Sequence, residues 1–202
     1  MKWKWVAWGA AALVLVVLLA THHGDSDHHD VDARHSDPIS QRDPARYAAS
    51  VRTYARAAGV DPRLVMAILY NESYKPHDPD TERAWQRVKP DAAFGVANMH
   101  HATFDETKRG RDFADRRWRE LPDDPKLAIE AEAWYLHDLA AELPAGRAGG
   151  YSTTELLALG YNTGGGNMLA FSQGASADDD ARAYLHRLHG NWKRASAAVA
   201  GS

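Results

Sequence analysis

The sharpest pattern of apolar and polar positions runs from Asp61 to Ser73 and predicts a helix. Asp61 suits the N-cap of this helix, and Pro62 suits its first turn. One stripe of the helix takes positions i, i+3, i+4 and i+7, and it consists of Val65, Ile68, Leu69 and Glu72. A carboxyl group therefore lies in line with three side chains that should face the core.

The position of Glu72 on this stripe predicts a half-buried carboxyl group. Burial disfavours the charged form, so such a glutamate can keep its proton near neutral pH and act as a general acid. The alternative is a glutamate at a helix end that turns outward into water, since glutamate is rarely fully buried. The pattern by itself leaves both interpretations open.

Further apolar stripes predict a mainly α-helical domain, and no segment has the alternation of a convincing strand. Capping signals and stripes place the other helices at 43–58, 104–119, 124–143, after the capping box at 152–155, and around 184–192. The spacing in the last helix assigns Tyr184 to the core. Polar residues from 74 to 91 predict a long loop, which can hold a short helix around Trp85.

The segment GYNTGGGN, from Gly160 to Asn167, contains three consecutive glycines. Such a run is found in phosphate-binding loops, but the lysine and the preceding strand of a P-loop are absent. We interpret the segment as a flexible bend that lets Tyr161 and Asn162 point into a cleft.

Residues 1–21 predict a transmembrane anchor. Two lysines precede an uncharged run from Trp5 to Ala20, close to the ~20 residues that span a bilayer. The lysines should stay in the cytoplasm, which places everything after Thr21 outside it. The alternative is a cleaved signal peptide and a secreted protein. Leu18 disfavours this alternative, because a small residue usually stands at that distance from a cleavage site.

Residues 22–43 are rich in histidine and aspartate and nearly free of apolar residues, which predicts a disordered linker. The pairs His22/His23 and His28/His29 could bind a transition metal, but no scaffold sets their geometry, and a solvated spacer is favoured. No metal site and no cofactor is predicted. The folded domain is expected at 44–197.

Composition narrows the class of protein. The 202 residues are 45% hydrophobic and carry a formal net charge of -3, which fits one well-packed domain with extensions and no nucleic-acid partner. The absence of cysteine excludes disulfides, thiol catalysis and thiolate metal sites.

Four separated segments are informative as a set: NES at 71–73, GVANMHHAT at 95–103, DPKLAIEAEAWYL at 124–136 and GYNTGGGN at 160–167. In order and approximate spacing, over residues 45–195, they resemble the motifs of lytic transglycosylases with the soluble-lytic-transglycosylase (SLT), goose-lysozyme-like domain. Those motifs are the helix-end Glu-Ser, G-L-M-Q-x-x-P-x-T, N-P-x-x-N-I-x-x-G-x-x-Y-L and A-Y-N-x-G-x-G-x.

This chain departs from the motifs at several positions. Among the departures are Val96, Ala97 and Asn98 in place of Leu, Met and Gln, His101 in place of Pro, and Ala128 and Glu132 in place of Asn and Gly. Asn98 offers the same amide as Gln, one methylene shorter, so sugar contacts can be kept with altered geometry.

The resemblance implies a lysozyme-like α domain that cleaves the β-1,4 bond between N-acetylmuramic acid and N-acetylglucosamine in peptidoglycan. Glu72 would protonate the glycosidic oxygen and then accept a proton from the muramoyl 6-hydroxyl, which closes a 1,6-anhydro ring. Tyr161 would hydrogen-bond near Glu72 and help to hold it. Ser73, Asn98 and Asn162 would contact saccharide, although a turn-stabilising amide is an equal alternative for the two asparagines.

Two other functions remain open on the sequence alone. One is a non-catalytic peptidoglycan-binding scaffold that uses the same cleft. The other is a lysozyme-type hydrolase, which needs a second carboxylate, and Asp78, Asp80 and Asp91 are available in the long loop. No second acid within the four segments is expected at the cleft, which favours attack by the substrate's own hydroxyl.

Overall fold

The computed structural model describes residues 42–74 and 77–201, so the predicted anchor at 1–21 and nearly all of the predicted linker at 22–43 lie outside the described residues. Within these ranges the chain forms eight α-helices, two short 3-10 helices and one isolated β-bridge, and no strand. The prediction of a mainly α-helical domain is confirmed. None of the described helices is long and apolar enough to cross a membrane.

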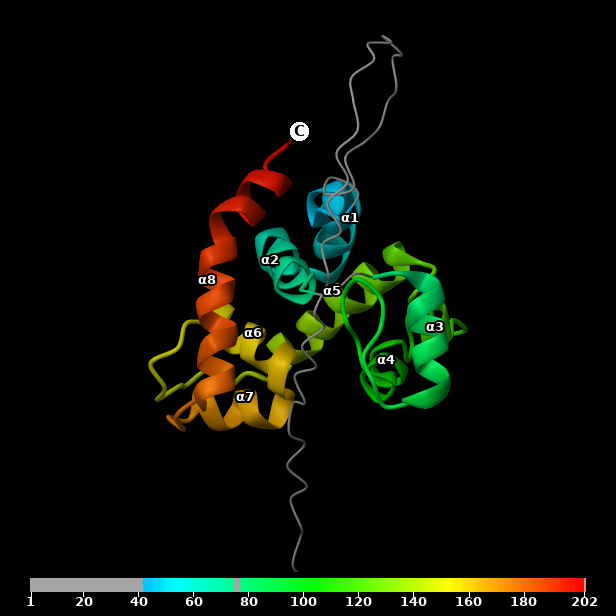
Figure 1. Ribbon diagram of the computed structural model, residues 1–202. Helices are drawn as coiled ribbons and strands as arrows, with labels where there is room; N and C mark the ends of the chain where they lie inside the picture. The colour runs from blue at the N-terminus through cyan, green and yellow to red at the C-terminus, as the bar shows by residue number, and fades with distance from the viewer. Residues whose placement is uncertain (1–41, 75–76, 202) are drawn as a thin grey trace, which may run out of the picture. The chain divides into compact units, whose positions relative to one another are not determined.

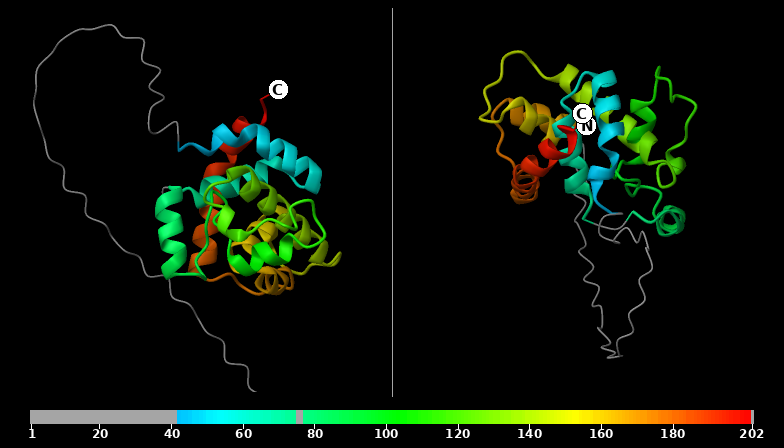
Figure 2. Two further views of the ribbon diagram at one scale, coloured as in Figure 1. Left: turned by 90° about the vertical axis from the view of Figure 1, so that its right-hand side faces the viewer. Right: turned by 90° about the horizontal axis from the view of Figure 1, so that it is seen from above.

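Several of the helices surround one central helix, α2, as Figure 1 shows. In chain order they are η1 (Pro44–Tyr47), α1 (Ala48–Ala58), α2 (Pro62–Glu72), α3 (Pro79–Val88), α4 (His101–Thr107), η2 (Trp118–Glu120), α5 (Pro125–Glu142), α6 (Thr153–Thr163), α7 (Gly165–Ser172) and α8 (Asp179–Val199). Helix α8 packs along α2, whereas α3 and α4 lie on the opposite side of the domain, which the view from above in Figure 2 also shows.

An Asp–Pro pair starts four of these helices. The aspartate accepts a hydrogen bond from a backbone N–H of the first turn, and the fixed φ of proline suits the position that follows. The four bonds are Asp43 from Ala45 (2.9 Å), Asp61 from Arg63 (2.8 Å), Asp78 from Thr81 (2.8 Å) and Asp124 from Leu127 (3.0 Å). Three of these starts were predicted, and the fourth begins α3 within the predicted loop.

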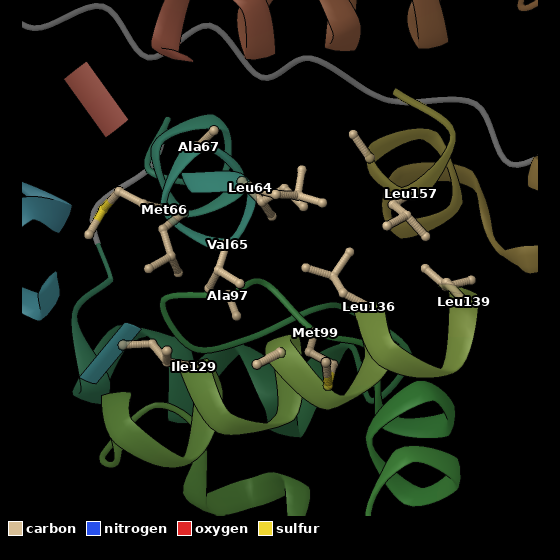
Figure 3. Close-up of a cluster of buried hydrophobic side chains, with 14 of the residues drawn as sticks. Leu64, Val65, Met66, Ala67, Ala97, Met99, Ile129, Leu136, Leu139 and Leu157 are labelled. Carbon is tan, nitrogen blue, oxygen red and sulfur yellow. The ribbon is translucent and has the colours of Figure 1, made fainter. Parts of the chain in front are cut away.

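Helix α2 is buried on all sides from Leu64 to Glu72. The sequence predicts one buried stripe, but α1, α5, α6 and α8 all contact this helix, so the remaining faces are covered as well. Figure 3 shows the apolar cluster that results, formed by side chains of α2, α5, α6 and the turn at Ala97 and Met99. The end of α2 therefore lies inside the domain and not at its surface.

Two predicted segments differ from the structure. Residues 104–119 are not one helix, because α4 ends at Thr107 and turns follow, with Gly110 at φ +72°. Phe113 and Trp118 are nevertheless buried, as predicted. The predicted loop at 74–91 contains the ten-residue helix α3, which is longer than the short helix expected around Trp85.

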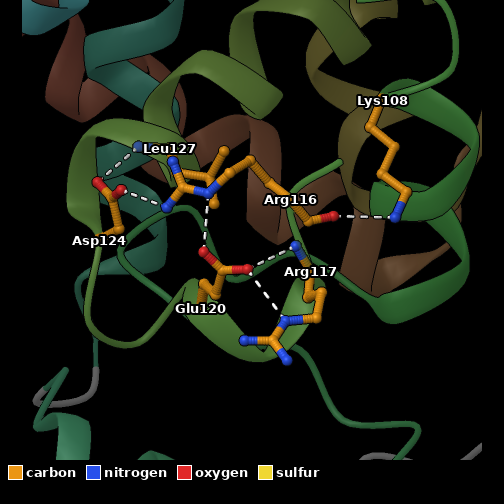
Figure 4. A network of polar contacts seen from close by, with 6 residues as sticks. All are labelled: Lys108, Arg116, Arg117, Glu120, Asp124 and Leu127. Atoms are coloured by element: carbon orange, nitrogen blue, oxygen red, sulfur yellow. Dashed lines mark hydrogen bonds and ion pairs between the residues drawn. The ribbon is translucent and has the colours of Figure 1, made fainter. Parts of the chain in front are cut away.

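A polar network joins η2 to the start of α5, as Figure 4 shows. The Arg116 guanidinium pairs with Glu120 at 2.7 Å and with Asp124 at 2.8 Å, and the Arg116 carbonyl accepts a hydrogen bond from Lys108 at 2.9 Å. Glu120 also accepts from the Arg117 backbone N–H at 2.9 Å. These contacts, and not a continuous helix, hold the segment between α4 and α5.

Candidate active site

Glu72 is the last residue of α2, and only 7% of its surface is exposed. Its Oε1 accepts a hydrogen bond from the Tyr184 hydroxyl at 3.0 Å, and its Oε2 accepts one from Asn98 Nδ2 at 3.0 Å. Both donors are neutral groups. The prediction of a carboxyl group on the buried face is confirmed, and the alternative of a glutamate that turns outward into water is wrong.

Tyr184 reaches Glu72 because hydrogen bonds between α2 and α8 fix how far α8 is shifted along α2. Asn71, the neighbour of Glu72, donates to the Tyr184 carbonyl at 3.1 Å and accepts from Asn191 Nδ2 at 2.6 Å. Burial, and then the Glu72 carboxyl, raise the pKa of the Tyr184 phenol well above its ordinary value. The sequence correctly assigns Tyr184 to the core, but its hydroxyl is also the direct partner of Glu72.

Asn98 approaches Glu72 from a tight turn between Phe94 and Met99, whose backbones exchange hydrogen bonds of 3.0 and 3.1 Å. Gly95 opens the turn at φ +74°, and a Cβ there would lie 2.9 Å from the Leu121 carbonyl oxygen, so only glycine fits. Asn98 itself has φ +49°, a conformation that asparagine tolerates better than most residues. Its amide is thus directed at Glu72, and contact of Asn98 with saccharide stays a prediction.

Helix α3 braces this turn against the end of α2. The buried Glu82 accepts from the Gly95 backbone N–H at 2.8 Å, and its other oxygen lies 2.9 Å from His77 Nδ1. His77 Nε2 lies 3.3 Å from the Glu72 carbonyl oxygen. The predicted loop therefore contributes the support of the site, and the polar pattern of its sequence gave no sign of these contacts.

Tyr161 supports the site indirectly. Its hydroxyl donates to the Ala97 carbonyl at 2.6 Å, so it holds the turn next to Asn98 and not Glu72 itself. Tyr161 and Asn162 lie on the last turn of α6, and the chain reverses only at Gly164, with φ +90°. The interpretation of the whole glycine-rich segment as a flexible bend is wrong, because Gly165 and Gly166 belong to α7.

Two predicted saccharide contacts remain, Ser73 and Asn162. The Ser73 hydroxyl donates to the Tyr70 carbonyl at 2.9 Å, and the Asn162 side chain is exposed. Tyr74, which the sequence did not single out, is 73% exposed, and its hydroxyl lies 3.5 Å from Asn98 Nδ2. Contact of Ser73 and Asn162 with saccharide stays a prediction.

A second carboxyl group belongs to the same cluster. Glu132 of α5 is 0% exposed, and neither of its oxygens has a hydrogen-bond partner among the described residues. Burial, and then the nearby Glu72, raise the pKa of Glu132 well above its ordinary value. Glu132 stands in the third of the four segments, but it has no exposed surface, so the expectation that these segments place no second acid at the cleft stays a prediction.

Of the three aspartates of the predicted loop, two have carboxylate contacts outside this cluster. Asp78 caps α3, and Asp80 pairs with Arg83 at 2.6 Å. Asp91 is exposed, and its carbonyl contacts His100 at 2.8 Å. Across residues 42–74 and 77–201, no group of three or more His, Asp and Glu residues could hold a metal ion.

The family of the Transglycosylase SLT domain matches residues 49–185, a span that contains all four segments as well as Glu72, Glu132 and Tyr184. The chain therefore belongs to this family of lytic transglycosylases, whose lysozyme-like domain acts on peptidoglycan. A comparison with curated proteins gives no match.

Proposed function

We propose that this domain cleaves the β-1,4 bond between N-acetylmuramic acid and N-acetylglucosamine and leaves 1,6-anhydro-N-acetylmuramic ends. The observation that carries the proposal is the Glu72 carboxyl group, nearly buried and held on each oxygen by a neutral donor. Burial disfavours the charged form, whereas the two donors favour it, so Glu72 can hold a proton before the transfer and a charge after it. The Tyr184 hydroxyl can donate to a carboxylate or accept from a carboxylic acid, so their contact survives that transfer.

The reaction requires two proton transfers at one carboxyl group. Glu72 gives its proton to the glycosidic oxygen as the bond from that oxygen to the muramoyl anomeric carbon breaks. The resulting carboxylate then accepts the proton of the muramoyl 6-hydroxyl, whose oxygen bonds to the anomeric carbon. Between the two transfers, the hydrogen bonds from Tyr184 and Asn98 stabilise the carboxylate.

An intramolecular hydroxyl needs no second carboxylate at the sugar, because it is already held beside the reacting carbon. The contacts of Asp78 and Asp80 and the burial of Glu132 support this reaction over hydrolysis, and the Asp91→Asn variant tests the remaining candidate acid. Asp78 and Asp80 are engaged in and around α3, and Glu132 has no exposed surface with which to reach a sugar. The exposed Tyr74 ring beside Asn98 offers a flat apolar surface for a sugar, and we propose further saccharide contacts at Ser73 and Asn162.

The test is digestion of purified sacculi by the full-length protein, followed by mass analysis of the products. Anhydro products are one water lighter than those of a lysozyme digest, and the Asp91→Asn variant should give the same product type. Reducing-end products that disappear in this variant would move the protein to the hydrolases. Binding of sacculi without any turnover would favour the non-catalytic scaffold.

We also propose that residues 1–21 anchor the protein in the cell membrane with the domain outside the cytoplasm, where peptidoglycan lies. The motivation is the uncharged run from Trp5 to Ala20 behind two lysines. Protease added to intact protoplasts should release a soluble fragment by cutting within residues 21–43. A mature protein that starts near Thr21 in every preparation would instead indicate a cleaved signal peptide.

A further inference from the structure

Glu132 is a buried acid that the proposed reaction does not use. It lies on the apolar stripe of α5 that includes Ala128, Leu136 and Leu139, all of them buried. A carboxyl group with no exposed surface and no hydrogen-bond partner destabilises a fold, because it has lost its hydration without replacement. An apolar side chain would suit this stripe better, so packing alone does not account for Glu132.

The ionisable groups around Glu132 come from three other helices. They are Glu72 of α2, Tyr161 of α6 and Tyr184 of α8. Burial raises the pKa of both tyrosines well above the ordinary value, so both are neutral near pH 7. The two tyrosines can therefore be left out of the charge changes of this cluster, which leaves the two carboxyl groups.

We propose that Glu72 and Glu132 hold one proton jointly through the pH range in which the enzyme works, with Glu132 as a positioning residue that acts only through Glu72. This inference rests on the proposed function, since it assumes that Glu72 is the general acid. Glu132 is not a second catalytic carboxylate, because no substrate atom can reach it.

Glu72 and Glu132 share one proton because two carboxylates in a low-dielectric site repel each other. This repulsion prevents both from being charged together. The pair therefore loses its two protons in well-separated steps, and one proton remains over the interval between them. Tyr184 and Asn98 donate to Glu72, whereas no described group donates to Glu132, so in most molecules Glu72 carries the charge and Glu132 the proton.

In the remaining molecules the proton sits on Glu72 and the charge on Glu132. Exchange moves one proton from the Glu132 carboxyl to the Glu72 carboxylate and leaves the total charge unchanged. Within the interval the share of molecules with a protonated Glu72 does not depend on pH. A lone carboxyl group, in contrast, loses its protonated form by about tenfold per pH unit above its pKa. Glu132 thus extends the activity of Glu72 toward alkaline pH.

The first experiment compares the full-length wild type with Glu132→Gln, a neutral variant of similar shape. We expect similar digestion of sacculi at acidic pH, where both carboxyl groups carry protons. On the alkaline side the rate of the variant should fall by about tenfold per pH unit while the wild type keeps its rate over a wider range. A pH profile that coincides with that of the wild type overturns the proposal.

The same pair of proteins gives a readout independent of activity. The folded-state pKa of Glu132 lies above the ordinary value of 4.5, so above that pH the folded protein binds more protons than the unfolded chain. The free energy of unfolding of the wild type must then fall as pH rises, until pH passes the raised pKa of Glu132. Glu132→Gln has no carboxyl group at this position and so lacks this loss. The melting temperature of the variant minus that of the wild type should therefore increase with pH. No such divergence would also overturn the proposal.

Glu130→Gln is the matched control. Glu130 lies on the same helix, but it is partly exposed, and its electrostatic neighbours are Asp112, Arg116 and Asp124 instead of Glu72. This variant should keep the alkaline limb of the wild-type pH profile.

A second measurement covers the case in which Glu132→Gln fails to fold. Carbon-13 NMR follows the Glu132 carboxyl in the wild type and in Glu72→Gln, where removal of the like charge should move its titration to lower pH. An unchanged titration refutes the coupling and leaves the proposed function intact. If the shift is present but the wild type never forms anhydro products, the coupling stands and the proposed function fails.

Discussion

The two sides of the domain use polar groups differently. Where α2 meets α8, polar groups are buried and hydrogen-bonded to one another, as with Asn71 and the Tyr184 carbonyl at 3.1 Å. On the side of α3 and η2, most charge pairs are partly exposed to solvent, as with Arg83 and Asp123 at 2.5 Å, where both side chains are more than 40% exposed, and the buried Glu82 is an exception. Buried contacts fix geometry strongly, because a lost partner leaves an unsatisfied group, whereas solvent screens the exposed ones.

The two sides meet at the turn that carries Asn98. Trp118 of η2 donates to the Met99 carbonyl at 2.9 Å. The His101 ring stacks on the indole of Trp118, with ring centroids 4.7 Å apart. Glu82 of α3 holds Gly95 from the other side of the turn. The charged side therefore acts on the site by shaping one turn, and the buried side holds the Glu72 carboxyl group itself through Tyr184. Four variants test this division.

The largest effect is expected for Glu72→Gln. Glutamine keeps the shape and the hydrogen-bonding capacity of the side chain but cannot give up a proton, and general acid–base catalysis is typically worth about 10²- to 10⁴-fold. Turnover of sacculi should fall by that factor, while circular dichroism shows unchanged helix content. A variant that digests sacculi as fast as the wild type would remove Glu72 from the reaction.

Tyr184→Phe should reduce turnover by roughly 10- to 100-fold, since a hydrogen bond to a charged group is worth about 1.5–3 kcal/mol. The ring that fills the core is retained, so the melting temperature should fall only by the effect of one lost buried hydrogen bond. Tyr135→Phe is the control, because Tyr135 is a partly buried tyrosine whose hydroxyl makes only a 3.4 Å contact with the Gly160 carbonyl. Equal losses in the two variants would show a general packing effect.

Asp124→Ala should lower the free energy of unfolding by about 1 kcal/mol at pH 7, the usual effect of losing an N-cap. Burial acts to raise the pKa of Asp124, but the Arg116 guanidinium and the Leu127 N–H outweigh it and hold the pKa below the ordinary 3.8. The stabilisation is therefore present at neutral pH and disappears as pH falls through this lowered pKa. Urea unfolding at pH 7 and at pH 3 measures the difference, and an equal loss at both would contradict the assignment.

The smallest effect is expected for Arg116→Met, which removes the pairs with Glu120 and Asp124. The Arg116 side chain is 40% exposed, so the loss should stay below about 1 kcal/mol and shrink further in high salt. Turnover should not change. A larger loss that persists in 1 M salt would show that this network behaves like the buried contacts of α2 and α8.

Local sequence determined the helix starts and the placement of Glu72. An Asp–Pro pair specifies a helix start through contacts within one turn, so the starts of η1, α2 and α5 could be predicted from neighbouring residues alone. The 3.6-residue period likewise put Glu72 on a buried face, and the same rule applied to α5 would have put Glu132 on one as well.

Only the tertiary structure decided what those buried groups meet. Tyr184 lies 112 residues from Glu72, and periodicity shows that its ring faces inward but not that its hydroxyl ends beside a carboxyl group. That contact depends on how far α8 is shifted along α2, which Asn71 and Asn191 set through hydrogen bonds between the helices. A pattern along one helix specifies a direction toward the core, whereas a site requires distances between helices, and these arise only when the helices pack.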